Sequence, residues 1–97
     1  MRLDKFLKVS RIIKRRTLAN EVCDGGRVTM NGRRAKAGAE VKVGDLIVID
    51  FGRRQLTFEV LEVRENVRAA EARDLYTVKS ETFKTDSDLP HLEDDPG

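Results

Sequence analysis

The stretch RVTMNGRRAK (residues 27–36) predicts a β-hairpin near the middle of the first half of a 97-residue chain. Asn31-Gly32 lies between two short segments, and both central positions of a two-residue hairpin turn need a positive φ, which Asn and Gly tolerate best. Helical periodicity lies before this hairpin and strand-like patterns lie after it. The sequence therefore predicts an α+β fold.

Upstream of the hairpin, the first ten residues predict an amphipathic helix. Leu3, Phe6 and Leu7 recur at the i, i+3 and i+4 spacing that places side chains on one face of a helix. Ile12 and Ile13 then interrupt this spacing. We expect a turn there, anchored by two buried branched side chains that fan the neighbouring cations outward.

A second short helix is expected between this turn and the hairpin. Leu18, Val22 and Cys23 form its apolar stripe, and Thr17 has the side chain of a typical N-cap. Gly25-Gly26 is expected to end the helix, because a left-handed residue after the last turn favours glycine.

Downstream of the hairpin, the sequence predicts strands. LIVIDF (residues 46–51) is a β-branched run typical of a central strand, and Gly44-Asp45 before it predicts a turn. QLTFEVLEV (residues 55–63) alternates, with Leu56, Phe58 and Val60 expected on one face and the alternation drifting over residues 61–63. A short helix in RAAEARDL (residues 68–75) and a last strand in YTVK (residues 76–79) complete the expected elements.

The chain is long enough for one small domain, which we expect to span residues 1–80. Residues 81–97 carry six acidic residues, one lysine and few hydrophobic side chains. A segment with a net charge of −5 and so little to bury is expected to form a disordered acidic tail.

The charge is distributed unevenly along the chain. Residues 1–36 hold 11 Lys and Arg against three acidic residues, a net charge of +8, and residues 37–97 have a net charge of −6. A basic block on an otherwise acidic chain is typical of proteins that bind a polyanion. The alternative is a basic helix face that only meets solvent.

No group of residues predicts catalysis. The one histidine, His91, lies in the acidic tail, and the one cysteine, Cys23, lies on an apolar stripe where a buried thiol is expected. No Cys/His cluster has metal-binding spacing. We therefore expect neither catalytic residues, nor a metal, nor a cofactor, and the protein is not expected to be an enzyme.

A cytoplasmic location is expected from the same composition. A single cysteine allows no disulfide within the chain, no apolar run has the length of a membrane span, and the charged N-terminus is unlike a signal peptide.

The aromatic residues bear on the kind of nucleic acid. Phe6, Phe51 and Phe58 occupy core-pattern positions and do not alternate with the cations. This favours a folded RNA or a duplex recognised by shape and phosphate over base stacking on an aromatic platform. A DNA-binding helix-turn-helix protein is a rival, but its recognition helix would offer only Asn20 and Glu21.

The order of these motifs resembles the S4 RNA-binding domain. A helix, a KRRT turn, a helix ending in GG, the NG hairpin and the GD turn follow one another across residues 1–51, and a sheet continuing to residue 63 is compatible. The resemblance implies an S4-type (alpha-L) fold, in which a two-helix turn packs on a small, bent, mostly antiparallel sheet.

MRLDKFLKVSRIIKRRTLA (residues 1–19) is also similar to the small stand-alone S4 proteins of bacterial ribosome-associated quality control. These are relatives of a small ribosome-associated heat-shock protein. The resemblance implies a monomer that binds large-subunit rRNA and peptidyl-tRNA on the large ribosomal subunit. With an RqcH-type tailing factor, it would support alanine tailing of stalled chains.

Three alternatives stay open beside this function: a heat-shock or assembly-type rRNA-binding S4 protein, an S4 module of the kind appended to RNA-modifying enzymes, and the DNA-binding protein above.

The candidate RNA-binding residues share charge or position with the basic turn and the hairpin. They are Arg2, Asp4, Lys5, Arg11, Lys14, Arg15, Arg16, Thr17, Arg27, Asn31 and Lys36. Asp4 is included because it matches the family pattern. It is expected either to orient a neighbouring arginine or only to favour the N-terminus of its helix.

Overall fold

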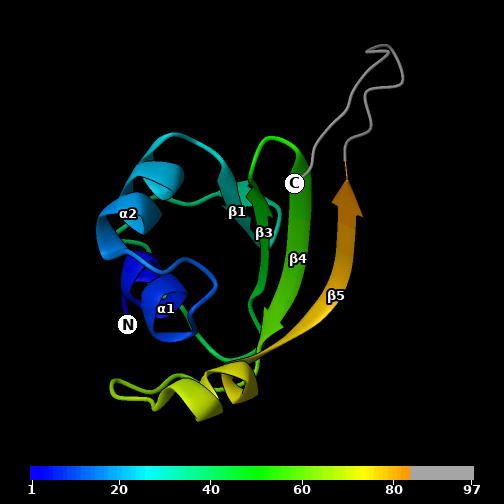
Figure 1. The fold of residues 1–97 in the computed structure, drawn as a ribbon. Coiled ribbons are helices and arrows are strands. Elements are labelled where there is room, and N and C mark those ends of the chain that lie inside the picture. The colour runs from blue at the N-terminus through cyan, green and yellow to red at the C-terminus, as the bar shows by residue number, and fades with distance from the viewer. Residues whose placement is uncertain (84–97) are drawn as a thin grey trace.

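The computed structural model describes residues 1–83. Its elements, in chain order, are α1 (Leu3–Val9), α2 (Arg16–Asp24), β1 (Val28–Met30), β2 (Arg33–Arg34), β3 (Leu46–Asp50), β4 (Arg54–Val60), a 3-10 helix η1 (Ala69–Leu75) and β5 (Tyr76–Phe83) (Figure 1). All of the helices and strands that the sequence predicts are present.

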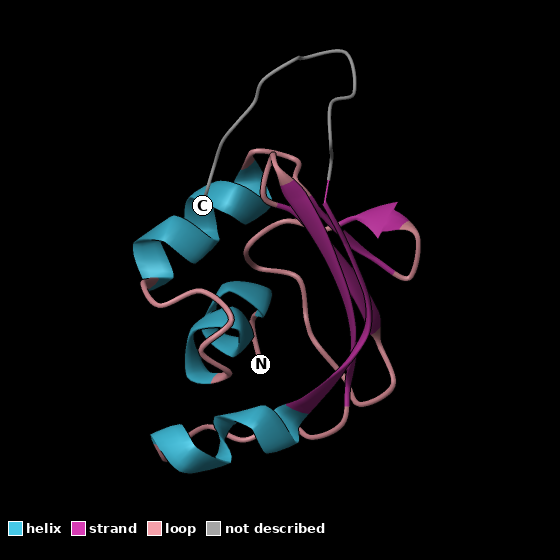
Figure 2. Ribbon diagram, turned by 45° about the vertical axis from the view of Figure 1, so that its right-hand side comes forward, coloured by secondary structure: helices cyan, strands magenta, loops and turns pink. Residues whose placement is uncertain are grey.

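The strands form one sheet in the order β2-β1-β3-β4-β5, with every neighbouring pair antiparallel. Strand β3 is central, as its β-branched sequence predicts. Figure 2 shows both α-helices on one side of this sheet, and η1 below them. The predicted α+β class, a two-helix turn packed on an antiparallel sheet, is confirmed.

The core lies between the helices and the sheet. Leu3, Phe6 and Leu7 of α1 are fully buried, as are Phe58 and Val60 of β4. The Phe6 and Phe58 rings stack with centroids 6.4 Å apart. The helical spacing in α1 and the alternating spacing in β4 therefore both predicted which side chains face the core.

Two turns have the backbone that the sequence predicts. Asn31 and Gly32 have φ values of 55° and 87°, which confirms the hairpin. At the end of α2, Gly26 has a φ of 81°. The N–H groups of Gly26 and Arg27 donate to the carbonyls of Cys23 and Val22. This is a Schellman motif, which satisfies carbonyls that the last helical turn leaves open.

Helix α2 differs from the prediction in two respects. It begins at Arg16 with Arg15 as the N-cap residue, and no side chain caps it, so the prediction that Thr17 is the N-cap is wrong. Leu18 is 48% exposed, whereas Ala19 and Cys23 are buried. Cys23 and the half-buried Val22 lie on the predicted stripe, but Ala19 takes the place of Leu18 in the buried face. The helix also starts at Arg16, two residues earlier than a Thr17 cap would place it.

An irregular segment after the hairpin fixes the start of α1. The N–H groups of Leu3 and Asp4 donate to the carbonyls of Ala39 (2.8 Å) and Ala37 (3.2 Å). The N–H of Ala37 in turn donates to the Asp24 carboxylate at 3.0 Å. These hydrogen bonds satisfy the first backbone N–H groups of α1 and connect the same segment to Asp24 at the end of α2. They therefore fix the start of α1 relative to the end of α2.

Strand β5 extends further than predicted. Glu81, Thr82 and Phe83, which the sequence analysis assigned to the tail, pair with Leu56, Gln55 and Arg54 of β4. Pairing with a neighbouring strand orders residues whose composition alone indicates no structure. The remaining tail residues, 84–97, lie outside the described residues, and so does His91.

Within residues 1–83, none of the helices has the length and apolar character that crossing a membrane requires.

Candidate nucleic-acid interface

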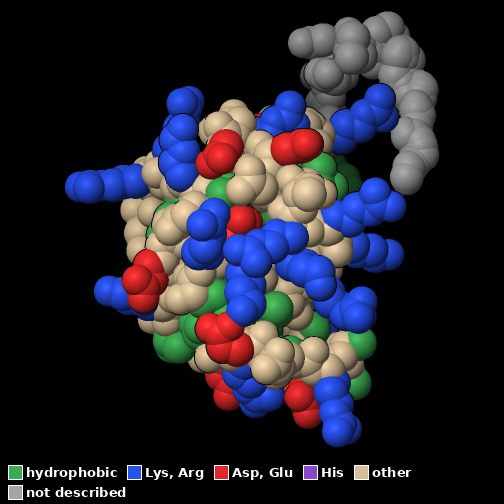
Figure 3. All heavy atoms as spheres, turned by 90° about the vertical axis from the view of Figure 1, so that its left-hand side faces the viewer, with side chains coloured by type: hydrophobic (Ala, Val, Ile, Leu, Met, Phe, Trp, Pro, Cys, Tyr) green, Lys and Arg blue, Asp and Glu red, His purple; other side chains and the backbone are tan. Residues whose placement is uncertain are grey.

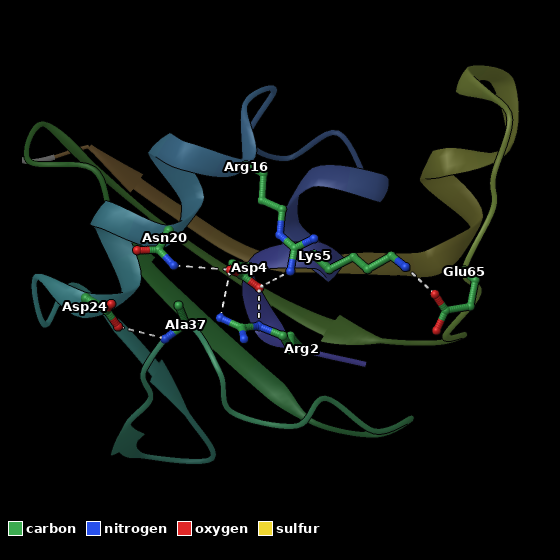
Figure 4. A network of polar contacts seen from close by, with 8 residues as sticks. All are labelled: Arg2, Asp4, Lys5, Arg16, Asn20, Asp24, Ala37 and Glu65. Carbon is green, nitrogen blue, oxygen red and sulfur yellow. Dashed lines mark hydrogen bonds and ion pairs between the residues drawn. The ribbon is translucent and has the colours of Figure 1, made fainter.

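A buried carboxylate, Asp4, lies at the centre of the helical surface. It is 2% exposed. Arg2 donates to it through Nε (3.2 Å) and Nη2 (3.3 Å), Arg16 through Nη2 (3.5 Å), and Asn20 through Nδ2 (3.3 Å) (Figure 4). One acidic group from α1 thereby holds two arginines, one before α1 and one at the start of α2, on the same surface.

These contacts set the charge state of Asp4. Burial alone would raise its pKa, but the hydrogen bonds from Arg2, Asn20 and Arg16 outweigh this and hold the pKa of the carboxyl below its usual value. The carboxylate is therefore charged at neutral pH. Of the two expectations for Asp4, the structure shows the one in which it orients arginines; the carboxylate also lies in the first turn of α1.

The two arginines keep much of their surface in solvent. The Arg2 and Arg16 side chains are 54% and 47% exposed while paired with Asp4. A guanidinium has five N–H donors and the carboxylate takes only some of them. Both arginines can therefore donate to a phosphate without leaving Asp4.

The turn between the helices presents further cations. Ile13 is buried, as predicted, whereas Ile12, also predicted to be buried, is half-buried; both pack with the core. Arg11, Lys14 and Arg15 are exposed, and no carboxylate of residues 1–83 pairs with them. Arg11 has a φ of 63°, an uncommon backbone for a residue other than glycine, which turns the chain out of α1.

The start of α2 also faces this surface. Within residues 1–83, no oxygen accepts a hydrogen bond from the backbone N–H groups of Arg16, Thr17 or Leu18. The first N–H of α2 that donates a hydrogen bond is that of Ala19, to the Arg15 carbonyl. Thr17 is exposed in this first turn. Open N–H groups at a helix N-terminus favour an anion.

Lys5 is less available than the other predicted cations. Its Nζ pairs with the carboxylate of Glu65, in the loop before η1 (Figure 4). The hydrogen bond and the positive charge of Lys5 hold the pKa of Glu65 below its usual value. The pair joins α1 to a loop 60 residues further along the chain, a partner that no local pattern could predict.

The hairpin residues lie apart from the Asp4 network. Arg27 and Lys36 are exposed. The Asn31 side chain is engaged within the turn: its Nδ2 donates to Asp45 at 3.0 Å, and its Oδ1 accepts from the Leu46 N–H at 2.9 Å. Asn31 thus ties the hairpin to β3, and a contact between Asn31 and RNA stays a prediction.

Figure 3 shows the face that α1 and α2 form, with Lys and Arg side chains spread across its middle. We call the exposed cations of α1 with its N-cap residue, of α2 and of the turn between them the basic helical face. It consists of Arg2, Lys8, Arg11, Lys14, Arg15 and Arg16.

Asn20 is a member of this site that the sequence analysis did not predict. It follows Arg16 by four positions on α2, the spacing that places two side chains on one face of a helix. That spacing was the available signal. Its meaning depended on Asp4, which only packing of α1 against α2 brings within reach.

Cys23 carries no chemistry of this site. It is buried, as predicted, and burial and the nearby Asp4 and Asp24 raise the pKa of its thiol to about 12. Within residues 1–83, no group of three or more His, Cys, Asp or Glu side chains could hold a metal ion.

The arrangement belongs to a known class of RNA-binding module. The profile of the S4 domain family matches residues 1–47, the stretch that carries both helices, the basic turn and the hairpin. The trimeric structure of Vibrio cholerae heat shock protein 15 has the same fold, with a TM-score of 0.76, 36% identity and 82% of each chain covered.

Sequence comparison identifies the family more closely. The RQC P-site tRNA stabilizing factor of Halalkalibacterium halodurans is 63% identical over 81 residues, which cover 84% of this chain and 92% of that protein. The factor of the same name from Bacillus subtilis is 52% identical over 81 residues, covering 84% and 94%. The chain belongs to the family of RQC P-site tRNA stabilizing factors, a family of non-enzymatic RNA-binding proteins with an S4 domain.

Proposed function

We propose that the protein binds RNA with the basic helical face and stabilises a P-site tRNA on the large ribosomal subunit. The observation that carries this proposal is the pair of arginines, Arg2 and Arg16, which one buried carboxylate fixes side by side while leaving donors open. Arginine forks held in place match phosphate oxygens with little loss of side-chain freedom on binding. The names of the relatives support the tRNA as the ligand.

The proposal extends to the setting of this activity. The ligand is a large subunit that carries peptidyl-tRNA after a ribosome has stalled in the cytoplasm. The protein contacts both large-subunit rRNA and the tRNA, as a monomer. By holding the tRNA while an RqcH-type factor delivers the next alanine, it supports alanine tailing of the stalled chain.

Each predicted residue has a place in this proposal. Arg2, Arg11, Lys14, Arg15 and Arg16 contact phosphates, and Asp4 positions two of them. The Thr17 hydroxyl and the open N–H groups of the first α2 turn meet a further phosphate. Lys5 contributes once it leaves Glu65, while Arg27, Lys36 and Asn31 extend the contact along the hairpin.

The test is Arg16→Ala, assayed by co-sedimentation with large subunits that carry peptidyl-tRNA and by alanine tailing. A hydrogen bond to a charged group contributes roughly 1.5–3 kcal/mol. Losing one such contact should therefore weaken association about tenfold or more. Lys79→Ala, at an exposed cation on β5, is the control. Wild-type co-sedimentation and tailing by a folded Arg16→Ala protein would show that the basic helical face is not the binding site.

Salt gives an independent check of the phosphate contacts. If four to six cations meet phosphates, log affinity should fall with log salt concentration at a slope of about −3 to −5. A flat response between low and physiological salt would contradict phosphate binding by this face.

A heat-shock or assembly-type rRNA-binding role is the second candidate. The heat shock protein 15 homolog of Aeromonas salmonicida is 40% identical over 70 residues, and the Vibrio cholerae protein shares the fold. Sucrose-gradient sedimentation separates the two functions. The proposed function requires enrichment on large subunits with peptidyl-tRNA; equal binding to subunits without tRNA favours the alternative.

A DNA-binding helix-turn-helix function has less support. Its recognition helix would need Asn20 free to read a base, and the Asn20 amide group donates to Asp4 instead.

A further inference from the structure

Three of the carboxylates near the basic helical face differ in what they bind. Asp4 holds two arginines and Asn20, and Glu65 pairs with Lys5. Glu21 is exposed on α2, and its carboxylate accepts no hydrogen bond and joins no ion pair within residues 1–83. An unneutralised acid beside a phosphate-binding surface opposes phosphate binding unless it has a ligand of its own.

Glu21 shares a hollow with the centre of the site. One shallow hollow between α1 and α2 is lined by Asp4, Arg16, Thr17, Asn20 and Glu21. Positions 16, 17, 20 and 21 follow the helical repeat, so these four side chains stand on the same face of α2. The acid therefore lies in the same hollow as Arg16 and Asp4, next to the basic helical face.

The hollow combines hydrogen-bond acceptors with donors. Glu21 offers two carboxylate oxygens. The amide nitrogen of Asn20 donates to Asp4, and within residues 1–83 no group donates to its side-chain carbonyl oxygen. Arg16 supplies donors next to them. The hollow therefore offers acceptors beside donors, a combination that suits a ligand with N–H groups next to a phosphate.

We propose that this hollow holds the edge of an unpaired guanine, whose N1–H and N2–H groups donate to the Glu21 carboxylate while Arg16 contacts a neighbouring phosphate. Guanine fits best because its Watson–Crick edge presents two adjacent donors to the two oxygens. Adenine and cytosine place a ring acceptor beside their amino group, and uracil has one N–H between two carbonyls. Proteins commonly read unpaired RNA bases at this edge. The inference rests on the proposed function, because the basic helical face must bind RNA.

The test compares three 15-nucleotide RNAs built from UUG, UUA and UU-inosine repeats. Inosine is guanine without the N2 amino group, so it removes one donor and leaves the phosphates unchanged. The wild-type protein should bind the UUG repeat about tenfold more tightly than the other two, because a carboxylate acceptor makes a charge-assisted hydrogen bond.

Glu21→Gln keeps the shape of the side chain and removes its charge and one acceptor oxygen. Because the variant lacks the charged acceptor, most of the free energy of the charge-assisted hydrogen bond should be lost. The affinities for the three RNAs should then lie within about twofold of one another. Asp74→Asn is the matched control, because Asp74 is another exposed acid without a side-chain partner in residues 1–83, at the end of η1. It removes the same charge and should leave the guanine preference intact.

The outcomes separate the two proposals. If Glu21→Gln strengthens binding to the UUG repeat as much as Asp74→Asn does, Glu21 is only a repulsive charge and the guanine site is wrong. Wild-type protein that binds the three RNAs equally, or binds none, also overturns it. Co-sedimentation of wild type with large subunits, and its loss in Arg16→Ala, would leave the proposed function standing in either case.

Discussion

The helices and the outer strands β4 and β5 of the sheet differ in how their cations are paired. On this outer part of the sheet, hereafter the sheet half, Arg54 pairs with Glu81 (2.5 Å) and Lys79 with Glu59 (3.3 Å). In the loop after β4, Arg64 pairs with Glu62 and Glu71 (2.9 and 3.4 Å). In the helical half, Asp4 serves two arginines, and Arg11, Lys14 and Arg15 have no carboxylate partner within residues 1–83.

This difference separates charges that the fold neutralises from charges that it leaves for a ligand. Exposed ion pairs such as those of the sheet half contribute little to stability, about 0–1 kcal/mol each. They do, however, remove net charge from that surface. The unpaired cations sum to a positive field over α1 and α2, which can attract RNA before contact is made.

The largest expected effect is on stability, and it comes from truncating a core side chain that packs between the helices and the sheet. Phe58 is fully buried, stacks on Phe6 and meets the edge of Tyr76. Phe58→Ala should lower the free energy of unfolding by about 3–5 kcal/mol, as truncation of a buried aromatic usually does. Chemical denaturation measures this. A loss under about 1 kcal/mol would mean that the helices and the sheet are stable without this shared core.

The second prediction tests the contrast directly. Removing Arg2 and Arg16 together should weaken ribosome association roughly a hundredfold, because each loses a charge-assisted contact. Co-sedimentation measures the loss. Arg54→Ala with Lys79→Ala removes two cations that the sheet half already neutralises, and should change affinity less than about threefold. Equal losses in the two double variants would show that only total charge matters.

A smaller effect is expected at the hairpin between the halves. Gly32 has a φ of 87°, and a Cβ there would meet nothing within 4 Å. Gly32→Val should therefore cost about 1–2 kcal/mol through backbone strain alone. Thermal unfolding measures it, with Gly38→Val as the control because Gly38 does not have a positive φ. An unchanged melting temperature would contradict the left-handed turn.

The smallest effect concerns the acid that serves the helical half. Because the folded state lowers the pKa of Asp4, its stabilising contribution is complete above the unfolded value of 3.8 and is lost as pH falls through the lower folded value. The free energy of unfolding should drop on acidification below about pH 4. In the Asp4→Asn variant, the free energy of unfolding should fall less over the same pH range. Identical pH profiles for the two proteins would mean that Asp4 does not prefer its charged form in the fold.

Features that depend on neighbouring residues in the chain were determined by the sequence alone. The positive φ at Asn31 and Gly32 and the end of α2 at Gly25-Gly26 follow from backbone sterics within a few residues. The buried faces of α1 and β4 follow from the helical and the alternating periods. The uneven charge, and with it the position of the basic helical face, could also be predicted.

Only the tertiary structure decided which polar groups meet. Asp4 binds Asn20, 16 positions away, and Lys5 reaches Glu65, 60 positions away. The local signal was misleading at Thr17, a good N-cap that lies inside the helix, and in residues 81–83, which pairing with β4 makes a strand. The physical reason is the same in each case: a side chain's partner is set by which elements pack together, and periodicity and turn chemistry describe only the element itself.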